Sequence, residues 1–419
     1  MTTTEDNAAT PDSAGTIGGR NHFTDFDLDS KEFSDNFDEV VDAVHAGCPV
    51  ARSEALGGYW VVSGFDEIRR IEQDWETWTS TDGYEPNRLG DDNARLFPLE
   101  LDPPYQTRWR ALLGDFFSPR AIRSKKAGVE ANANALIDRF IEAGECDFID
   151  AFAAHLPGRV FFSTMLGVPL DDLPYLQAAA DQAVRGPFET RGEGWNKVGA
   201  YLDGYMKQRQ QEEPRGDFVD AILQGVNTDD GEPAPWHHKV FVMVDMLAGG
   251  LATTSILLAG IADFLATHPE DAARIKADLS LVPNAVEECL RYYASILALG
   301  RTATKDTEIE GCPIKKGDMV MLGFAAAARD PRHYDDPHRI KIDRKIPTNM
   351  AFGYGPHRCI GSHLARLQGQ VAMELLLERL PDLKLAPGTK PTYSHSTVTR
   401  DIENLHIVFT PGPRVGDGT

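Results

Sequence analysis

The sequence predicts a mainly α-helical fold with small β-sheets, and three stretches of the chain support this. Most segments between residues 127 and 225 place apolar side chains at helical spacing. Residues 236–267 form the longest helical candidate, whose middle is so apolar that most of its faces must be buried. Residues 302–323 have the pattern of short strands and turns instead, with a hairpin turn expected at residues 316–318.

The other elements follow in chain order. A strand at residues 60–62 turns into a helix, and residues 82–104 form a long loop because Gly, Pro, Asn and Asp dominate them. A further helix begins at the Asp-Pro-Pro sequence that ends this loop. Pro269 and Pro283 mark the starts of two more helices, since proline fits the first helical turn. The last helix spans about residues 360–380, and short strands follow it.

The composition indicates one large acidic domain. The 419 residues contain no long linker and no internal repeat, so we expect a single domain over residues 21–412, a disordered tail at 1–20 and a flexible tail at 413–419. The net charge of −22 disfavours nucleic acid and anionic membrane surfaces as partners. The chain has no apolar run of 18 residues and no secretory signal, which predicts a cytoplasmic protein without a membrane span.

Five cysteines are spread widely along the chain, at positions 48, 146, 289, 312 and 359. Their odd number, their wide spacing and the absence of C-x-x-C argue against a disulfide framework or a structural zinc site. Cys359 differs from the others because it lies in the sequence F-G-Y-G-P-H-R-C-I-G, residues 352–361, directly before a predicted helix.

Two properties of this decapeptide suit a metal ligand. Gly353 and Gly355 allow backbone angles, or a close approach, that a side chain would block. A thiolate at a helix N-terminus is stabilised by the helix dipole and by backbone N–H groups, and cysteine thiolate is the proximal haem ligand of oxygen-activating proteins. A buried thiol beside an ordinary turn is the simpler interpretation of an isolated cysteine, but the whole decapeptide favours a ligand.

A second candidate site lies in the middle of the long apolar helix, in the sequence L-A-G-G-L-A-T-T. Gly249 and Gly250 each cost a helix interior about 1 kcal/mol, which the close approach of a flat group would offset. The Thr253 hydroxyl can donate to the Gly249 carbonyl four residues earlier, which bends a helix locally. Taken alone, these residues would favour a small-residue packing seam between helices.

Four motifs in order resemble those of the cytochrome P450 family over about residues 102–361. The decapeptide matches the family's haem-binding motif F-G-x-G-x-H-x-C-x-G at every fixed position, and the glycine pair resembles its oxygen-binding motif A/G-G-x-D/E-T-T/S. Residues 102–110 are similar to the segment D-P-P-x-H-x-x-x-R. Glu288 and Arg291 match E-x-x-R, and the resemblance implies that they form a structural network with Arg339.

The resemblance implies a triangular, mainly α single domain that holds haem b between the long helix and the cysteine-ligand helix. It also implies a haem-thiolate monooxygenase, which inserts one oxygen atom from O2 into its substrate. Cys359 would be the iron ligand, and Thr253 would hold the hydrogen-bond network beside dioxygen in a groove formed with Gly249, Gly250 and Ala252. The other cofactor contacts that the family motifs imply are Phe352, Gly353, His357, Gly361, Arg301, Arg110 and Gln106.

Three positions depart from the family pattern. Ala252 replaces the acid that usually precedes the threonine and begins a proton relay, which puts the standard relay in doubt. Gln106 replaces the commoner histidine, so one contact to a haem propionate would be an amide. Ile340 replaces an aromatic residue in the segment that supplies Arg339.

The resemblance also implies the partners. Electrons would come from NAD(P)H through a ferredoxin reductase and a 2Fe-2S ferredoxin, which would dock on a basic patch of Arg108, Arg110, Arg358 and Arg366. The segments that match the family's pocket are apolar or small, so we expect a small apolar substrate such as a terpenoid or an aromatic compound. Those segments supply Leu247, Ala248, Leu251, Leu297, Ala298, Leu299, Thr397 and Val398. A carboxylate anchor would instead use Arg88, Arg95, Arg185 or Arg191.

Two alternatives stay open at this point. A peroxide-driven peroxygenase on the same scaffold is favoured by Ala252 and disfavoured by Thr253. A haem-based sensor or carrier without catalysis is disfavoured by the full set of oxygen-handling residues. The sequence leaves the substrate, the site of its oxidation, the ferredoxin and the oligomeric state open.

Overall fold

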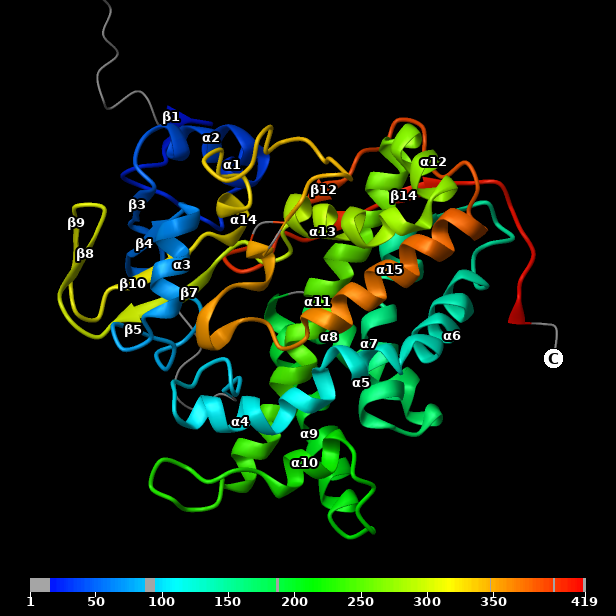
Figure 1. Cartoon of the computed structure of the whole chain (residues 1–419), viewed down its shortest axis with the longest axis horizontal. Helices are drawn as coiled ribbons and strands as arrows, with labels where there is room; N and C mark the ends of the chain where they lie inside the picture. Colours follow the sequence, from blue (N-terminus) through cyan, green and yellow to red (C-terminus); the bar gives the residue numbers. More distant parts are fainter. Residues whose placement is uncertain (1–15, 87–94, 186–187, 347, 395, 417–419) are drawn as a thin grey trace, which may run out of the picture.

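The computed structural model describes residues 16–86, 95–185, 188–346, 348–394 and 396–416. Helices form most of the molecule, and its outline is roughly triangular, with the largest sheet toward one corner (Figure 1). This confirms the expected mainly α fold with small sheets. The helices are α1 Lys31–Asp35, α2 Phe37–Ala46, α3 Phe65–Gln73, α4 Tyr105–Gly114, α5 Pro119–Arg123, α6 Lys126–Ile137, α7 Leu156–Val160, α8 Leu173–Arg185, α9 Phe188–Arg209, α10 Phe218–Gln224, α11 Trp236–Thr267, α12 Pro269–Ala277, α13 Val282–Tyr293, α14 Phe324–Ala327 and α15 Ser362–Arg379.

The largest sheet has the strand order β3-β4-β10-β7-β5. Its strands are β3 Val50–Ser53, β4 Tyr59–Val62, β5 Trp78–Thr79, β7 Leu299–Ala303 and β10 Met319–Leu322. β4 confirms the strand expected at residues 60–62 and leads directly into α3. β10 runs parallel to β4 and antiparallel to β7. This sheet positions Arg301, one of the predicted cofactor contacts, in the protein interior.

The turn expected at residues 316–318 forms, but the predicted hairpin pairing around it is wrong. Asp318 N donates to Lys315 O at 2.9 Å, which closes the turn. The preceding strand, β9 Cys312–Ile314, pairs with β8 Thr307–Ile309, whereas β10 joins the large sheet. Val320, Met321 and Leu322 are all fully buried, so β10 belongs in the middle of a covered sheet rather than in a two-stranded ribbon. Turn residues alone do not specify which strand becomes the partner.

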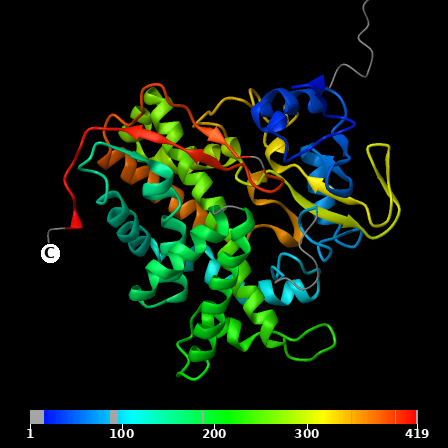
Figure 2. The ribbon, with the colours of Figure 1, turned by 180° about the vertical axis from the view of Figure 1, so that it is seen from behind.

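Smaller sheets lie on the opposite face, where the C-terminal strands cross the helices (Figure 2). One has the order β11-β14-β6, and β12 pairs with β13 as a short antiparallel ribbon. The strands of these two sheets are β6 Glu145–Asp147, β11 Lys384–Leu385, β12 Thr392–Tyr393, β13 Ile402–Asn404 and β14 His406–Val408. β1 Thr16–Ile17 and β2 Arg20–Asn21 form a separate ribbon near the N-terminus. The ribbon of β12 and β13 brings residues 394–403 beside the middle of the chain's longest helix.

That longest helix, α11, has the bounds that the sequence predicts and forms the axis of the core. Sixteen of its residues are buried, most of them in its second half. It packs against α7, α9, α13 and α15. α11 is long and apolar enough to cross a membrane by length and composition alone. Most of its buried side chains belong to the largest apolar cluster of the described residues.

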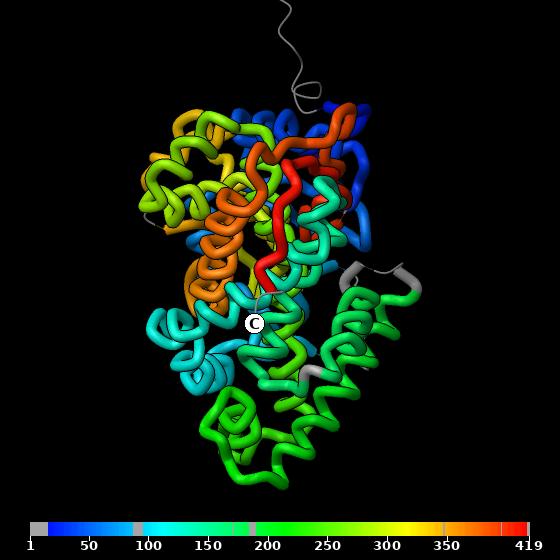
Figure 3. Tube along the Cα trace, turned by 90° about the vertical axis from the view of Figure 1, so that its right-hand side faces the viewer, coloured from blue at the N-terminus to red at the C-terminus, as the bar shows by residue number. Residues whose placement is uncertain are grey.

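Structure extends beyond the predicted domain boundaries of 21 and 412. β1 pairs with β2, so residues 16–20 form part of a small ribbon rather than a disordered tail. At the other end, the backbone N–H groups of Val415 and Gly416 donate to Asp138, which closes α6, at 3.1 and 2.9 Å. Arg379 donates to Pro413 O at 3.2 Å, so the C-terminal segment lies beside α15 (Figure 3). Residues 1–15 and 417–419 of the predicted tails lie outside the described residues.

Candidate active site

The Cys359 loop is built on the end of α3, and its glycines make that possible. Gly353 and Gly355 both have φ of +62°, where a side chain is strained. A Cβ on Gly353 would lie 2.7 Å from Glu72 Oε1, and one on Gly355 would lie 2.2 Å from the Glu72 carbonyl oxygen. Tyr354 N donates to Glu72 Oε2 at 2.8 Å. The structure therefore confirms that both glycines supply backbone angles and a close approach.

Cys359 is exposed, although Phe352 and Ser362 at the two ends of its loop are buried. Phe352 and Ser362 are 8% and 2% exposed. Cys359 N donates to Phe352 O at 2.8 Å, which closes the loop just before α15. The protein around the thiol raises its pKa through burial, and the Gly361 N–H together with Arg110, Arg366 and Arg358 acts in the opposite direction. Burial outweighs these donors and cations, so the pKa of Cys359 stays above its ordinary value.

Three predicted cofactor contacts converge near the same loop. Burial lowers the pKa of His357 well below its usual value, and the charges of Arg301 and Arg110 lower it further, which shows that both guanidinium groups lie near the imidazole. A hydrogen bond of 3.2 Å joins His357 Nε2 and Ser80 Oγ. Arg110 donates to the carbonyl oxygen of Arg358. The cluster is a cationic site suited to a dianion.

Gln106 lies at this cluster but already has a protein partner. It is 1% exposed, and its Nε2 donates to the carbonyl oxygen of Pro356 at 2.6 Å. Oε1 accepts a hydrogen bond from Thr107 at 3.2 Å. The amide that replaces histidine thus supports the Cys359 loop from α4.

Arg301 is buried beside two acids that the sequence analysis missed. It is 3% exposed, and burial lowers its pKa, while the charges of Glu72 and Asp102 act against that lowering. Burial raises the pKa of Glu72 to about 7, opposed by Arg301 and by the Tyr354 N–H. Glu72 comes from a helix with no motif around it, so its one detectable signal is an acid on the apolar side of α3.

The predicted network of Glu288 and Arg291 forms, but its third member is Arg344 rather than Arg339. Glu288 and Arg291 are both 0% exposed, and Arg291 Nε donates to Glu288 Oε1 at 2.7 Å. Arg344 Nε lies 2.9 Å from the same oxygen. Arg339 has an exposed side chain and contributes its carbonyl oxygen, which accepts from Arg291 Nη2 at 2.9 Å. The turn after residue 340 brings the later arginine inward, while Ile340 occupies a buried apolar position.

A second acid–base pair beside this network also escaped the sequence analysis. The side chain of Arg366, on α15, donates to both carboxylate oxygens of Glu287, with an Nη2 to Oε2 distance of 3.1 Å. Its guanidinium also lies 4.3 Å from the centre of the Phe352 ring. Asn349 donates to the Glu287 carbonyl oxygen at 2.9 Å. α13 therefore fixes both ends of the Cys359 loop.

The glycine pair of α11 borders open space, as the oxygen-groove hypothesis requires. A Cβ built on Gly249 or on Gly250 would meet no atom within 4 Å. Thr253 Oγ1 donates to Gly249 O at 2.7 Å, which confirms the predicted back-bond. The Thr253 carbonyl oxygen also accepts from Ser295 Oγ at 2.8 Å. Exposed cysteine, open helix backbone and clustered cations together fit the flat, dianionic haem b.

The predicted pocket residues divide between this region and the core. Leu297 and Ala298 are 5% and 0% exposed and belong to an apolar cluster with the N-terminal helices, so the structure does not bring them to an accessible surface. Leu299 packs against the apolar cluster of the large sheet. Leu247 and Leu251 are buried on α11, and Ala248 is half-buried. Thr397 and Val398 are half-buried in the C-terminal ribbon, where the Val398 carbonyl accepts from Leu297 N at 2.8 Å.

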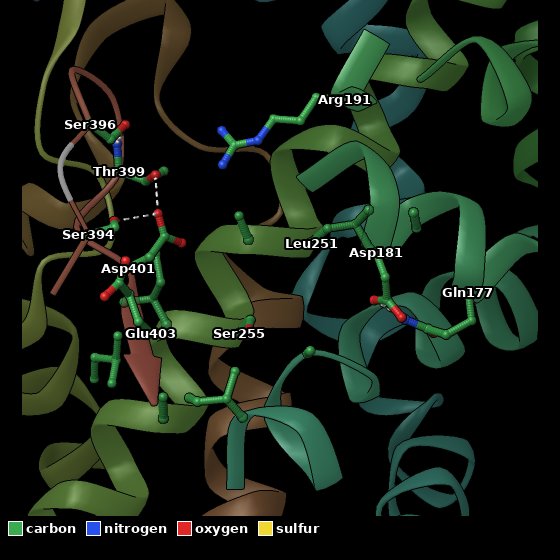
Figure 4. A pocket seen from close by; sticks show the side chains of 17 residues that line it. Gln177, Asp181, Arg191, Leu251, Ser255, Ser394, Ser396, Thr399, Asp401 and Glu403 are labelled. Atoms are coloured by element: carbon green, nitrogen blue, oxygen red, sulfur yellow. Dashed lines mark hydrogen bonds between the residues drawn. The ribbon is translucent and has the colours of Figure 1, made fainter. Parts of the chain in front are cut away.

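A cavity of about 280 Å³ lies on the Ala252 side of α11, between α8, α9 and the C-terminal ribbon (Figure 4). Its lining is mixed, with Leu251, Ala252 and Ile256 on α11 and several polar side chains around them. Figure 4 shows Asp401 and Thr399 on one side, Gln177 and Asp181 on the other, and Arg191 reaching in from α9. Thr399 Oγ1 donates to Asp401 at 2.6 Å. Ala252, which stands where the family motif has an acid, therefore borders a polar cavity.

Of the four arginines considered as carboxylate anchors, Arg191 lines this cavity. Arg95 Nη1 donates to the Thr81 carbonyl oxygen. Arg88 and the side chain of Arg185 lie outside the described residues.

Comparisons with known proteins agree with this geometry. The sequence model described as Cytochrome P450 matches residues 182–408. The chain is 30% identical over 411 residues to 6-deoxyerythronolide B hydroxylase of Saccharopolyspora erythraea, a match that covers 91% of this chain and 98% of the relative. The chain belongs to the cytochrome P450 family.

Further relatives and solved structures support the same assignment. The Vitamin D3 dihydroxylase of Streptomyces griseolus is 36% identical over 316 residues, which cover 74% of this chain and 77% of the relative. The structure of CYP101C1 matches with a TM-score of 0.84 at 26% identity, covering 93% of this chain and 97% of that one. CYP108D1 from Novosphingobium aromaticivorans matches with a TM-score of 0.78 at 28% identity, covering 91% and 96%. This P450 is thus a monooxygenase of a family that binds haem b through a cysteine thiolate.

Proposed function

We propose that Cys359 is the iron ligand and that this P450 hydroxylates a small, largely apolar organic substrate with electrons from NAD(P)H, a ferredoxin reductase and a 2Fe-2S ferredoxin. The observation that carries the proposal is the exposed Cys359 on a loop built from glycines, beside a cationic cluster. When bound, haem b supplies the activation of dioxygen and the insertion of one oxygen atom.

The residues of the chain have separate tasks in this proposal. The Gly361 N–H and the nearby arginines act against the burial that raises the pKa of Cys359, and an iron ion bound there would hold the sulfur as a thiolate. Arg110, Arg301 and His357 bind the propionates, and the amide of Gln106 stiffens the loop that carries His357 through its bond to Pro356. The mutual repulsion within this cationic cluster is relieved when two carboxylates bind there.

Thr253 and Ala252 determine how protons reach the oxygen side. In its present hydrogen bond the Thr253 hydroxyl donates to Gly249 O, so its oxygen can accept a hydrogen bond from water; to relay a proton, the hydroxyl would turn its own hydrogen from Gly249 O toward the oxygen side. Ala252 provides no acid, but it lines the polar cavity of about 280 Å³. Such a space is roomy and polar enough to hold ordered water. We therefore assign proton supply to water in this cavity, passing to Thr253 Oγ1.

The proposed ferredoxin surface needs a correction to its membership. Arg108 forms an ion pair with Asp229, and Arg110 is turned toward the Arg358 carbonyl oxygen. The charges that surround His363 are those of Arg366, Arg358 and Arg123. We define the docking patch as Arg123, Arg358 and His363 beside the Cys359 loop, without Arg366, which is paired with Glu287. Its positive charge suits an acidic carrier, and the bacterial neighbours support a cytoplasmic location.

Two measurements test this function. The reduced protein with carbon monoxide should give the red-shifted Soret band of a thiolate-ligated haem, and an unshifted band would overturn the assignment of Cys359. Product formation should depend on NADH and the carrier proteins, with an association rate that falls as salt rises because exposed charges are screened. Turnover driven by hydrogen peroxide alone, and faster than with the carriers, would replace this function by the peroxygenase that Ala252 favours.

A further inference from the structure

Asp245 stands on the same stripe of α11 as the oxygen-side residues. It precedes Gly249 by four residues and Thr253 by eight, and side chains at this spacing lie above one another on a helix. At 1.5 Å per residue, Asp245 lies about 6 Å along the helix axis from Gly249 and about 12 Å from Thr253. Because a Cβ on Gly249 would meet nothing within 4 Å, this stripe borders open space.

Electrostatic contacts locate Asp245 on the cofactor side of α11. The pKa of Arg110 is lowered by burial, and the charges of Cys359 and Asp245 both act against that lowering. Arg110 therefore lies near the thiol loop and near Asp245. In addition, Asp245 Oδ2 accepts from Leu99 N, in the segment before α4, at 3.2 Å.

The second oxygen of this carboxyl has no hydrogen-bond partner within the part of the chain that the structure describes. Asp245 is 6% exposed, and its Oδ1 makes no hydrogen bond with any of the described residues. Val244, Leu247 and Phe97, its neighbours in sequence or in the adjoining segment, are all buried and apolar. A ligand atom bonded to Oδ1 would supply the partner that the described residues do not.

The protonation state determines which ligand atom fits. Burial raises the pKa of Asp245 to about 8, and the charge of Glu100 acts in the same direction. The Leu99 N–H and the charge of Arg110 act against this rise. The carboxyl is therefore mostly neutral at pH 7, and a neutral carboxyl carries an O–H that can donate. A neutral oxygen acceptor matches such a donor, whereas a cation would need the ionised form.

We propose that Asp245 donates one hydrogen bond to a ketone or alcohol oxygen of the substrate, about one helical turn from the carbon that is oxidised. This inference rests on the proposed monooxygenase function and deepens it. The substrate is then an apolar skeleton with one oxygen atom, bound in a fixed orientation, rather than a pure hydrocarbon. Asp245 acts as a specificity-determining residue through this single polar contact.

A matched pair of rigid ligands tests the contact without turnover. 2-Adamantanone and adamantane share one skeleton and differ by the carbonyl group, and their binding to the haem-loaded ferric protein can be measured by the spin-state shift and by calorimetry. One hydrogen bond is worth about 1.4 kcal/mol here, which is a tenfold preference for the ketone. We expect this preference in the wild type at pH 7.

Two substitutions separate the hydrogen bond from packing. Asp245→Leu should abolish the preference and bind adamantane as well as the wild type does, because the apolar contact is kept. Asp245→Asn should retain it, since its amide still donates. Asp263→Asn is the matched control on the same helix, because Asp263 accepts from Tyr293 OH at 2.7 Å, and it should leave both affinities unchanged.

The pH dependence adds an independent readout. Asp245 ionises as the pH passes 8, so the ketone preference of the wild type should fall between pH 7 and pH 9 while that of Asp245→Asn stays constant. The proposal fails if the wild type binds the ketone no more tightly than the hydrocarbon, or if Asp245→Asn and Asp245→Leu lose the preference alike. A normal red-shifted carbonyl band in the same preparation would show that such a failure concerns Asp245 and not the proposed function.

Discussion

The Cys359 loop and the middle of α11 meet the same cofactor space, yet the protein holds them very differently. The loop is fixed by Glu72 from α3, by Gln106 from α4 and by Arg366 from α15. The segment of α11 from Asp245 to Thr253 has open space beside its glycines and one carboxyl oxygen with no hydrogen-bond partner among the described residues. The ligand side is thus rigid before the cofactor binds, whereas the oxygen side is left open for substrate and water. We infer that the contacts of the Cys359 loop serve stability, whereas the middle of α11 serves substrate selectivity.

Removal of the Cys359 thiol should have the largest effect on the spectrum and on activity, because this thiol is the proposed iron ligand. Cys359→Ser should abolish both the red-shifted carbonyl band and NADH-dependent product formation, since an alcohol cannot supply the electron density of a thiolate. Both are measured on purified protein with equal haem content. Cys146→Ser is the control, because that half-buried thiol lies in β6, which pairs with β14, and has no role in the proposal. Retention of the band in Cys359→Ser would remove the central assignment.

The rigidity of the loop is tested at Gly355. Gly355→Ala combines a strained positive φ, about 1–2 kcal/mol, with a clash against the Glu72 carbonyl oxygen, which overpacking data set at about 1–3 kcal/mol. Gly311→Ala has a similar φ of +81° but meets nothing within 4 Å, so it measures the φ cost alone. Urea unfolding of both variants should show the larger loss of stability at Gly355. Equal losses would mean that α3 does not constrain the loop.

In the network of Glu288, Arg291 and Arg344, substitution of either of two arginines should have a smaller effect, and the two variants should differ clearly from each other. Arg344→Gln removes a buried cation from Glu288, which should cost about 2–3 kcal/mol of unfolding free energy. Arg339→Gln keeps the carbonyl oxygen that Arg291 uses, so it should change stability by about 0.5 kcal/mol or less. Urea unfolding at constant pH compares the two. A larger loss at Arg339 would restore the assignment that the motif spacing suggested.

The same contrast shows which parts of this molecule the sequence can predict. The bounds of α11 and the conformation of Gly353 and Gly355 follow from local residue types, because apolar runs, proline and glycine act on their own backbone. Arg344 and the pairing of β10 depend on where distant segments meet. No local pattern encodes such meetings, so the motif named the correct segment but the wrong arginine.

The sequence predicts the α11 residues on the oxygen side, but it does not predict the space and the segments around them. The bond from Thr253 to Gly249 follows from a four-residue spacing. The cavity beside Ala252 is lined by α8, α9 and the C-terminal ribbon. One carboxyl oxygen of Asp245 accepts from Leu99 N, and the other has no partner among the described residues. Space and unmet hydrogen bonds are properties of the packed molecule, so a sequence motif cannot state them.

The smallest expected effect sharpens the role of Ala252. Asp at this position would extend into the polar cavity of about 280 Å³, which has room for a carboxyl group. Because three acids, Asp181, Asp401 and Glu403, line that cavity against Arg191, like charges should raise the pKa of the new carboxyl and favour its protonated, proton-donating form. Product formed per NADH should therefore rise a few-fold in Ala252→Asp, with less peroxide released. Thr253→Ala should lower it in either background, since the hydroxyl is the step between water and the oxygen side.

Ala252→Asn separates acid chemistry from a filled cavity. It has the size of Asp but cannot release a proton, so it should leave product per NADH at or below the wild-type value under matched substrate saturation. Equal gains in Ala252→Asn and Ala252→Asp would show that displaced water, not proton supply, sets the yield. High wild-type yield that neither Ala252→Asp nor Thr253→Ala alters would place the proton path elsewhere. In that case the open space beside α11 would serve the substrate alone, and the carboxyl of Asp245 would be its one polar determinant.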